Sequence, residues 1–377
     1  MMKRIESIDV MRGISIMGIL FMNIVGFHMN ELYTHPIDHF HTSMDRFLYY
    51  LDVLFVHNSF YPIFSFLFGF GLAIMAANIK ERGGNFLPIL YRRVFALLIF
   101  GMLHGVLIFY GDILNVYAVL GMIAIIFLLL PNIVSLITAT VISVLYLLIN
   151  LILMVAAIVE PQMLQFTSSE ESKHWIDVMH SGDIGKIITL NQQFFLENFS
   201  ALSVTGIFSY GLSVLPFILF GMFAMRANLI DRINLNKKVS ITIAFISFII
   251  GLLIKYYTIY ADLNMFSGQA FIFYGGTFVA ISYFIATVLV CNYKPIYTYL
   301  KPFQRAGKMS FTLYITQSVI MFIIFYVFKL YAMLSLVEVY MIAVIIIILE
   351  LVFATLYFKR FKYGPLEWIW RKITYLK

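Results

Sequence analysis

Charged residues and cysteine are both scarce in this chain of 377 residues. Only 12% of the residues are charged, whereas 62% are hydrophobic and the mean hydropathy is +0.92. Soluble domains carry about a quarter charged residues, so the composition excludes an ordinary soluble protein and indicates a polytopic membrane protein. The single cysteine, Cys291, excludes a disulfide within the chain and a metal cluster built on cysteine.

Several motifs that carry chemistry in other proteins are also missing. The sequence has no GxxxxGK[ST] phosphate-binding loop, no GxSxG elbow and no HExxH helix. The first absence excludes an ATPase that works through its own phosphate-binding loop. His35, His39 and His41 lie close together, but Pro36 interrupts any helical spacing between them. We therefore expect no metal site.

Long apolar runs dominate what is present. A spanning helix needs about 20 mostly apolar residues. Ten segments meet this test, the fourth of them short enough to form a tight hairpin with the third: they lie near 9–28, 58–78, 93–111, 113–130, 133–159, 203–225, 239–258, 270–291, 309–328 and 338–358. The first lacks a signal-peptide cleavage site, so we expect it to be retained. The prediction is an all-α polytopic membrane protein, in which residues 1–377 form one transmembrane domain.

Basic residues indicate the orientation of these spans. With the N-terminus inside, 20 of the 26 lysines and arginines fall at cytoplasmic ends or loops. The positive-inside rule then places both termini in the cytoplasm. It also explains the net charge of +7 without nucleic acid, which we do not expect as a partner. The extracytoplasmic segments 29–57 and 160–202 are long and amphipathic, and they predict short helices lying at the interface.

The most informative polar residues are His104 and Asp112, because ionisable groups inside spans are costly and often functional. A hairpin between the third and fourth spans would bring them to one depth. Asp112 then either caps the fourth helix or orients His104 as the carboxylate of a general-base pair. For His104 alone, the alternative is a buried neutral histidine bonded to a carbonyl group.

Two helices carry a polar stripe. In the first span, Asp9 and Arg12 can pair, and Asn23 lies about three turns further along the same face. In the third span, Arg93 and His104 are likewise eleven residues apart. The arginines suit a phosphate-bearing donor that enters from the cytoplasm, or they are simply positive-inside anchors.

The ninth span adds Tyr314 and Gln317, and the latter shares a face with Ser310. These groups can line a cavity or form hydrogen bonds between helices. His57 lies at the mouth of the second span, where Pro62 follows and a helix is expected to begin.

Six motifs resemble those of the bacterial YeiB-like membrane family, known as domain of unknown function 418, over nearly the whole chain. The ninth-span motif departs from the family at Leu313, where an asparagine is usual. The motifs are Ile8-Asp-Val-Met-Arg-Gly13 with Asn23, Phe64-Ser-Phe-Leu-Phe-Gly-Phe-Gly71, Gly101-Met-Leu-His-Gly105, Gly111-Asp-Ile-Leu114 with Tyr117, Gly307 to Gln317, and Gly364-Pro-Leu-Glu-Trp-Ile-Trp-Arg371.

The Asp-x-x-Arg-Gly opening is also similar, more distantly, to that of membrane acyltransferases that use cytosolic acyl-CoA and an intramembrane histidine. This resemblance implies acyl-CoA bound by Arg12 and Arg93, with His104 as base and Asp112 as its partner. The acceptor would be a cell-envelope glycan, lipid or small metabolite. The residues expected to contact substrate are Asp9, Asn23, His57, Tyr117, Tyr314 and Gln317.

Two alternatives stay open. The same polar stripe would suit a transporter of a small solute, with His104 and Asp112 as a proton relay. A non-catalytic envelope protein is the third reading. The expected location is the bacterial plasma membrane; the oligomeric state is left open, and a homodimer is compatible with the sequence.

Overall fold

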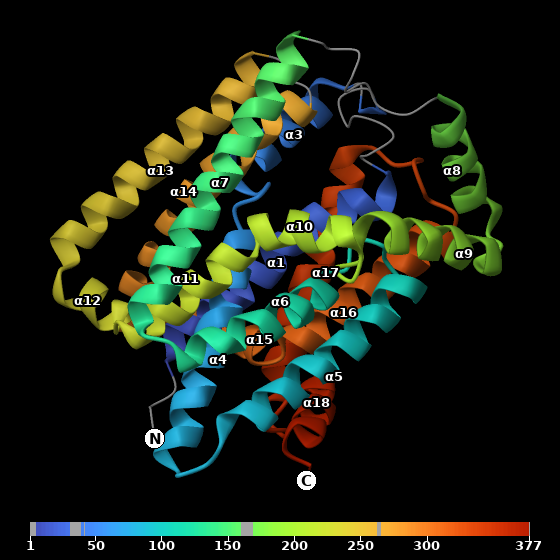
Figure 1. Cartoon of the computed structure of the whole chain (residues 1–377). Coiled ribbons are helices and arrows are strands. Elements are labelled where there is room, and N and C mark those ends of the chain that lie inside the picture. Colours follow the sequence, from blue (N-terminus) through green and yellow to red (C-terminus); the bar gives the residue numbers. More distant parts are fainter. Residues whose placement is uncertain (1–4, 31–38, 41, 160–168, 262–264, 377) are drawn as a thin grey trace.

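The computed structural model describes residues 5–30, 39–40, 42–159, 169–261 and 265–376, and helices account for most of these ranges (Figure 1). Within the described residues, nine helices are long and apolar enough to cross a membrane. The prediction of an all-α polytopic membrane protein is therefore confirmed. The division into one domain is not tested by this arrangement and stays a prediction.

Each candidate span overlaps a segment expected from the sequence. They are α1 (Glu6–His28), α4 (Tyr61–Glu81), α5 (Phe86–Leu107), most of α7 (Asn132–Val159), α10 (Val204–Ser213) with α11 (Leu215–Arg226), α13 (Lys237–Tyr260), most of α14 (Met265–Val290), α16 (Ser310–Phe322) with the π-helix Ile323–Val327, and α17 (Leu336–Tyr357). The expected fourth span is the shorter apolar helix Leu114–Leu129, of which α6 covers Leu114–Ile126. It packs closely against α5, as expected for a hairpin.

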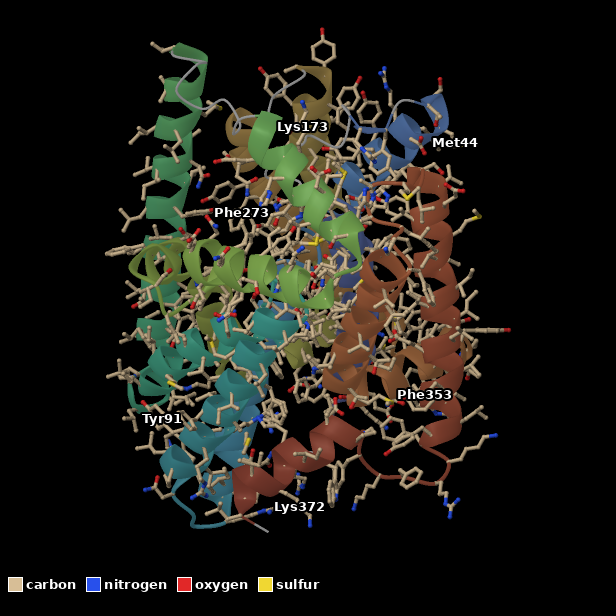
Figure 2. All side chains as sticks on the ribbon, turned by 90° about the vertical axis from the view of Figure 1, so that its right-hand side faces the viewer. Met44, Tyr91, Lys173, Phe273, Phe353 and Lys372 are labelled. Carbon is tan, nitrogen blue, oxygen red and sulfur yellow. The ribbon has the colours of Figure 1, made fainter. Side chains whose placement is uncertain are left out.

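The bundle has two ends, which we call lower and upper after Figure 1. The lower end holds α18 (Pro365–Tyr375) and the connection between α4 and α5, and the upper end holds α3 (Ser43–Phe55) and α8 (Ser169–Ser181). Figure 2 shows Lys372 toward the lower end and Lys173 toward the upper end. The short helices α3, α8 and α9 (Ile184–Phe194) lie in the two amphipathic segments where interfacial helices were expected; residues 31–38, 41 and 160–168 of those segments lie outside the described residues.

Glycine permits the closest contact between α1 and α15 (Lys294–Lys308). A Cβ atom added to Gly13 would lie 1.9 Å from the carbonyl oxygen of Phe303, and one added to Gly307 would lie 1.8 Å from that of Asp9. Neither site can hold a larger residue unless the backbone moves. The packing therefore joins the Asp-x-x-Arg-Gly motif to the motif that begins at Gly307.

The sixth expected span is broken. α10 ends at Ser213, α11 begins at Leu215, and Pro216 lies in the first turn of α11. Proline suits a first turn because it has no N–H group to satisfy there, and it disfavours a continuous helix through the preceding residue. In Figure 1, α10 lies across the bundle, whereas α11 runs toward the lower end. The break directs the side chains of α10 toward a cavity in the upper half.

Candidate functional site

His104 and Asp112 lie in direct contact. His104 is in the last turn of α5, and Asp112 precedes α6 in the connection between the two helices. The distance from His104 Nδ1 to Asp112 Oδ1 is 2.8 Å, and both side chains are almost completely buried. The hairpin expected from the sequence thus brings the two residues together.

Asp112 also caps α6. Its second oxygen, Oδ2, accepts from the backbone N–H of Asn115 at 2.7 Å and from the Asn115 side chain at 3.1 Å. Asn115 Oδ1 in turn accepts from the backbone N–H of Ala201 at 2.8 Å. The two readings of Asp112 are therefore compatible, because one carboxylate oxygen caps the helix while the other faces the imidazole.

The remaining ring nitrogen of His104 is Nε2. Nε2 is buried and has no hydrogen-bond partner among the described residues. The ring lies beside that of Tyr314, with 5.0 Å between the centroids. If Nδ1 carries the proton and donates to Asp112, Nε2 is left with a lone pair that can accept a proton.

A cavity of about 300 Å³ opens toward the lower end. Its wall holds four cations and one carboxyl group, mixed with aromatic and aliphatic residues: Arg12, Arg93, Lys308, Arg371 and Glu367. Arg12 pairs with Asp9 at 3.4 Å. The excess of positive charge makes this lower cavity suited to an anionic ligand.

Helix α18 forms part of that wall, and the closing motif of the sequence attaches it. Glu367 accepts hydrogen bonds from the backbone N–H groups of Phe311 and Thr312 at 2.8 and 3.1 Å, and from the Thr312 hydroxyl at 2.5 Å. Trp370 donates to the carbonyl oxygen of Arg93 at 2.8 Å. The guanidinium of Arg93 lies 3.6 Å from the Trp370 ring centroid, so Arg93 is held by a cation–π contact.

A second cavity, of about 370 Å³, lies toward the upper end. Most of the polar groups in its wall are neutral, and Asp112 adds a carboxylate. The polar and aromatic residues that line it include Asn23, Asn30, His57, Asn58, Tyr61, Tyr110, Asp112, Tyr210, Gln269 and Tyr314. Such a wall can form hydrogen bonds with a polar ligand without demanding charge.

Three residues line both cavities: Ile19, Ile113 and Tyr314. They form a thin partition between the lower and the upper cavity. His104 lines neither cavity, but Asp112 and Tyr314, which both contact it, line the upper one. The imidazole therefore packs against Tyr314, one of the three residues of the partition.

Five of the other predicted site residues line one of the two cavities, and two do not. Arg12, Arg93 and Tyr117 line the lower cavity, and Asn23 and His57 line the upper cavity. The Tyr117 hydroxyl lies 3.1 Å from that of Ser65.

Asp9 and Gln317 line neither cavity. Gln317 instead donates to Glu350 of α17 at 2.7 Å, which is the interhelical hydrogen bond considered as the alternative.

Glu350 and Lys255 are buried ionisable residues that were not singled out from the sequence. Glu350 is 4% exposed, inside α17. Lys255 is completely buried in α13 and donates to the carbonyl oxygen of His57 at 2.5 Å and to the Ser59 hydroxyl at 2.8 Å. Lys255 was counted only as a basic residue near an outer loop, although a charge deep in an apolar run is itself a signal.

Metal ligands do not cluster in the described part of the chain, where no three His, Cys, Asp or Glu residues gather closely enough to hold an ion. His35 and His41 lie outside the described residues.

Comparisons with known proteins agree with the resemblance seen in the motifs. Residues 224–377 match the family described as "Protein of unknown function (DUF418)". The chain is 28% identical to "Uncharacterized protein YxaH" of Bacillus subtilis (strain 168), over 99% of this chain and 95% of that protein. It is 24% identical to "Uncharacterized protein YeiB" of Escherichia coli (strain K12), over 99% and 97%.

A further relative is the "Uncharacterized 39.9 kDa protein in amylase 3'region" of Bacillus acidopullulyticus, 26% identical over 99% of this chain and 94% of that protein. No solved structure matches. The chain is thus similar to DUF418 proteins over its C-terminal part and to three bacterial proteins, YeiB among them, over nearly its whole length.

Proposed function

We propose that this protein is a transmembrane acyltransferase that moves an acyl group from cytosolic acyl-CoA to an extracytoplasmic acceptor. The observation that carries the proposal is the unpartnered Nε2 of His104, buried behind a thin partition between two cavities of different chemistry. A cationic cavity on one side and a neutral polar cavity on the other suit two different substrates.

The lower cavity would hold the donor. Arg12, Arg93 and Arg371 offer guanidinium groups to the phosphates of coenzyme A, and guanidinium binds phosphate in a bidentate manner. The wall between these arginines and Tyr314 is apolar at Leu67 and Leu97. This lining suits an acyl-thioester arm that extends toward the partition.

The chemistry would take place at the partition. The acceptor hydroxyl gives its proton to Nε2 of His104 while its oxygen attacks the thioester carbonyl carbon. The C–S bond then breaks, and the proton passes to the leaving sulfur to give free coenzyme A. Asp112 holds the Nδ1 proton and stabilises the imidazolium that forms. Tyr314 is the side chain whose movement would admit the substrates to Nε2.

The test uses protein in nanodiscs with radiolabelled acetyl-CoA. We expect saturable binding, and slow transfer or hydrolysis of the label, in the wild type. His104→Gln should keep the binding and lose turnover by roughly 10²–10⁴-fold, the usual contribution of a general base. His174→Gln, an exposed histidine of α8, is the control and should behave as the wild type.

Arg92 and Arg93 offer a matched pair for the donor site. The two are neighbours in α5 and are equally charged, but only Arg93 lines the lower cavity. Arg93→Gln should weaken acetyl-CoA binding by roughly 10-fold or more, as expected for one charge-assisted contact. Arg92→Gln removes a hydrogen bond to the carbonyl oxygen of Thr374 in α18 but no charge that lines the cavity, so its effect on binding should be clearly smaller. Absence of saturable binding by folded wild-type protein would refute the acyl-CoA proposal.

Transport of a small solute is the second candidate, and the partition favours it, because a solute would have to pass only the few residues that separate the lower from the upper cavity. The two functions differ in their products. An acyltransferase releases free coenzyme A, whereas a transporter releases its substrate unchanged on the other side. Assay of free thiol in sealed proteoliposomes therefore separates them.

A further inference from the structure

A further cavity is larger than both the lower and the upper one. It is an apolar groove of about 610 Å³ between α4, α11, α12 (Leu229–Leu235), α13 and α14. The floor consists of buried side chains, among them Ile63, Ile233 and Phe284. The rim is formed by exposed side chains of α13 and α14, namely Val239, Ile243 and Ile281, so the groove opens toward the bilayer.

The groove has one charged end. Arg232 lines it near the lower end, with Asn236 one turn later. Lys237 and Lys238 follow at the start of α13 and are exposed. Arg232 forms no ion pair with any described residue, and no carboxylate lines the groove. The mouth therefore has an uncompensated positive charge at the level where lipid headgroups are expected.

The rest of the lining is hydrocarbon. Between Arg232 and Pro62, the wall is made of aliphatic and aromatic side chains with few polar groups. Ser240 is already satisfied, since its hydroxyl donates to the carbonyl oxygen of Ile233 at 3.1 Å, and Thr277 donates to that of Phe273 at 2.9 Å. The hydroxyl hydrogens of Ser240 and Thr277 are thus already used, so this part of the groove offers a polar ligand few partners, whereas an acyl chain needs none.

We propose that this groove binds one anionic phospholipid, with the phosphate at Arg232 and an acyl chain lying along α13 toward Pro62. Charge decides between lipids: a cation at the membrane surface attracts anionic headgroups, and a zwitterionic lipid gains little from it. The site is separate from the proposed acyl-transfer site, because it shares no lining residue with the lower or the upper cavity.

Native mass spectrometry of the delipidated full-length protein tests the proposal. Titration with phosphatidylglycerol and phosphatidylcholine should show one high-affinity site that prefers phosphatidylglycerol. Arg232→Gln should reduce that preference by roughly fivefold, the effect of one cation near the surface. Lys301→Gln, an exposed lysine of α15 outside the groove, is the matched control and should keep the preference.

A second variant tests whether the groove holds an acyl chain, and it leaves Arg232 unchanged. Val239→Trp fills the groove from its rim, where Val239 is 59% exposed, so folding is not at risk. It should lower occupancy by phosphatidylglycerol, whereas Val344→Trp on the exposed face of α17 should not. Glycerol phosphate should not compete. Equal binding by all variants, or competition by glycerol phosphate, would overturn the proposal in favour of annular lipid or a plain phosphate site.

Discussion

At the scale of single residues, Asp112 joins two roles through three side-chain hydrogen bonds. It accepts one hydrogen bond toward His104 and two from Asn115. Asp112→Asn keeps the shape, but if the amide oxygen stays on Asn115, the NH2 group faces Nδ1 of His104. The imidazole is then forced to carry its proton on Nε2, so its free lone pair is lost.

We expect Asp112→Asn to keep donor binding and to lower turnover by roughly 10³-fold or more. ¹⁵N chemical shifts of labelled histidine check the cause directly, because they distinguish the two tautomers. Asp183→Asn, at an exposed helix cap, is the control. An unchanged tautomer together with lost turnover would contradict the orienting role.

Glu367 is a second residue with a measurable consequence. Glutamine at this position keeps one acceptor oxygen and loses the other, so Glu367→Gln should cost about 1–2 kcal/mol in the free energy of unfolding. Thermal unfolding in detergent gives the number. A variant as stable as the wild type at every pH would show that the capping of α16 contributes nothing.

The pH dependence of this effect has a definite sign. Burial raises the pKa of Glu367 above its ordinary value of 4.5, and the hydrogen bonds from Thr312 and Phe311 offset the shift only in part. Because the pKa of Glu367 is raised in the folded state, the stability that the protonated Glu367 contributes is fully present below pH 4.5. This contribution is lost as the pH rises through the folded-state pKa. The difference in the free energy of unfolding between the wild type and Glu367→Gln should therefore be largest at acidic pH and become smaller as the pH rises.

At the scale of helices, glycine contacts decide the packing of α1 on α15. Gly307→Ala places a methyl group 1.8 Å from the Asp9 carbonyl oxygen, so the two helices must separate. We expect a loss of about 1–3 kcal/mol, as for other overpacked sites. Gly211→Ala in α10 is the matched control, because a Cβ atom there meets nothing within 4 Å. That control should be neutral or slightly stabilising in a helix. Equal stability of both variants in a thermal melt would show that the close approach is dispensable.

The helices were predictable from the sequence because apolar runs of spanning length admit few alternatives in a membrane. The contact between His104 and Asp112 was also predictable, since they are only eight residues apart across a tight hairpin. The partner of Gln317 was not: Glu350 is 33 residues further along, in another helix. Such pairings depend on how the helices are arranged, and hydropathy does not encode that arrangement.

Local signals were available for two of the features that were missed. Asn115 follows Asp112 by three residues, the spacing at which a capping side chain meets its partner. Lys255 lies within the expected span 239–258, where a charged side chain is stable only if it pairs with a buried acceptor. The bonds that Lys255 makes to His57 and Ser59, by contrast, required the structure.

At the scale of the whole molecule, the orientation in the membrane is still a prediction. The positive-inside rule places the lower end in the cytoplasm. Single cysteines at Lys173 and Lys372, in a Cys291→Ser background, lie toward opposite ends (Figure 2). A membrane-impermeant maleimide should label Lys173→Cys in intact cells, and Lys372→Cys only after lysis. The reverse pattern would invert the topology.

The partition formed by Ile19, Ile113 and Tyr314 also determines where the membrane potential would act on a substrate. If both cavities fill with water, nearly all of the membrane potential drops across this short apolar layer. Moving one elementary charge through it then involves about 2.3 kcal/mol per 100 mV, whereas a neutral acyl group crosses at no electrical cost. Turnover that ignores an imposed voltage would thus mean that whatever passes this layer carries no net charge.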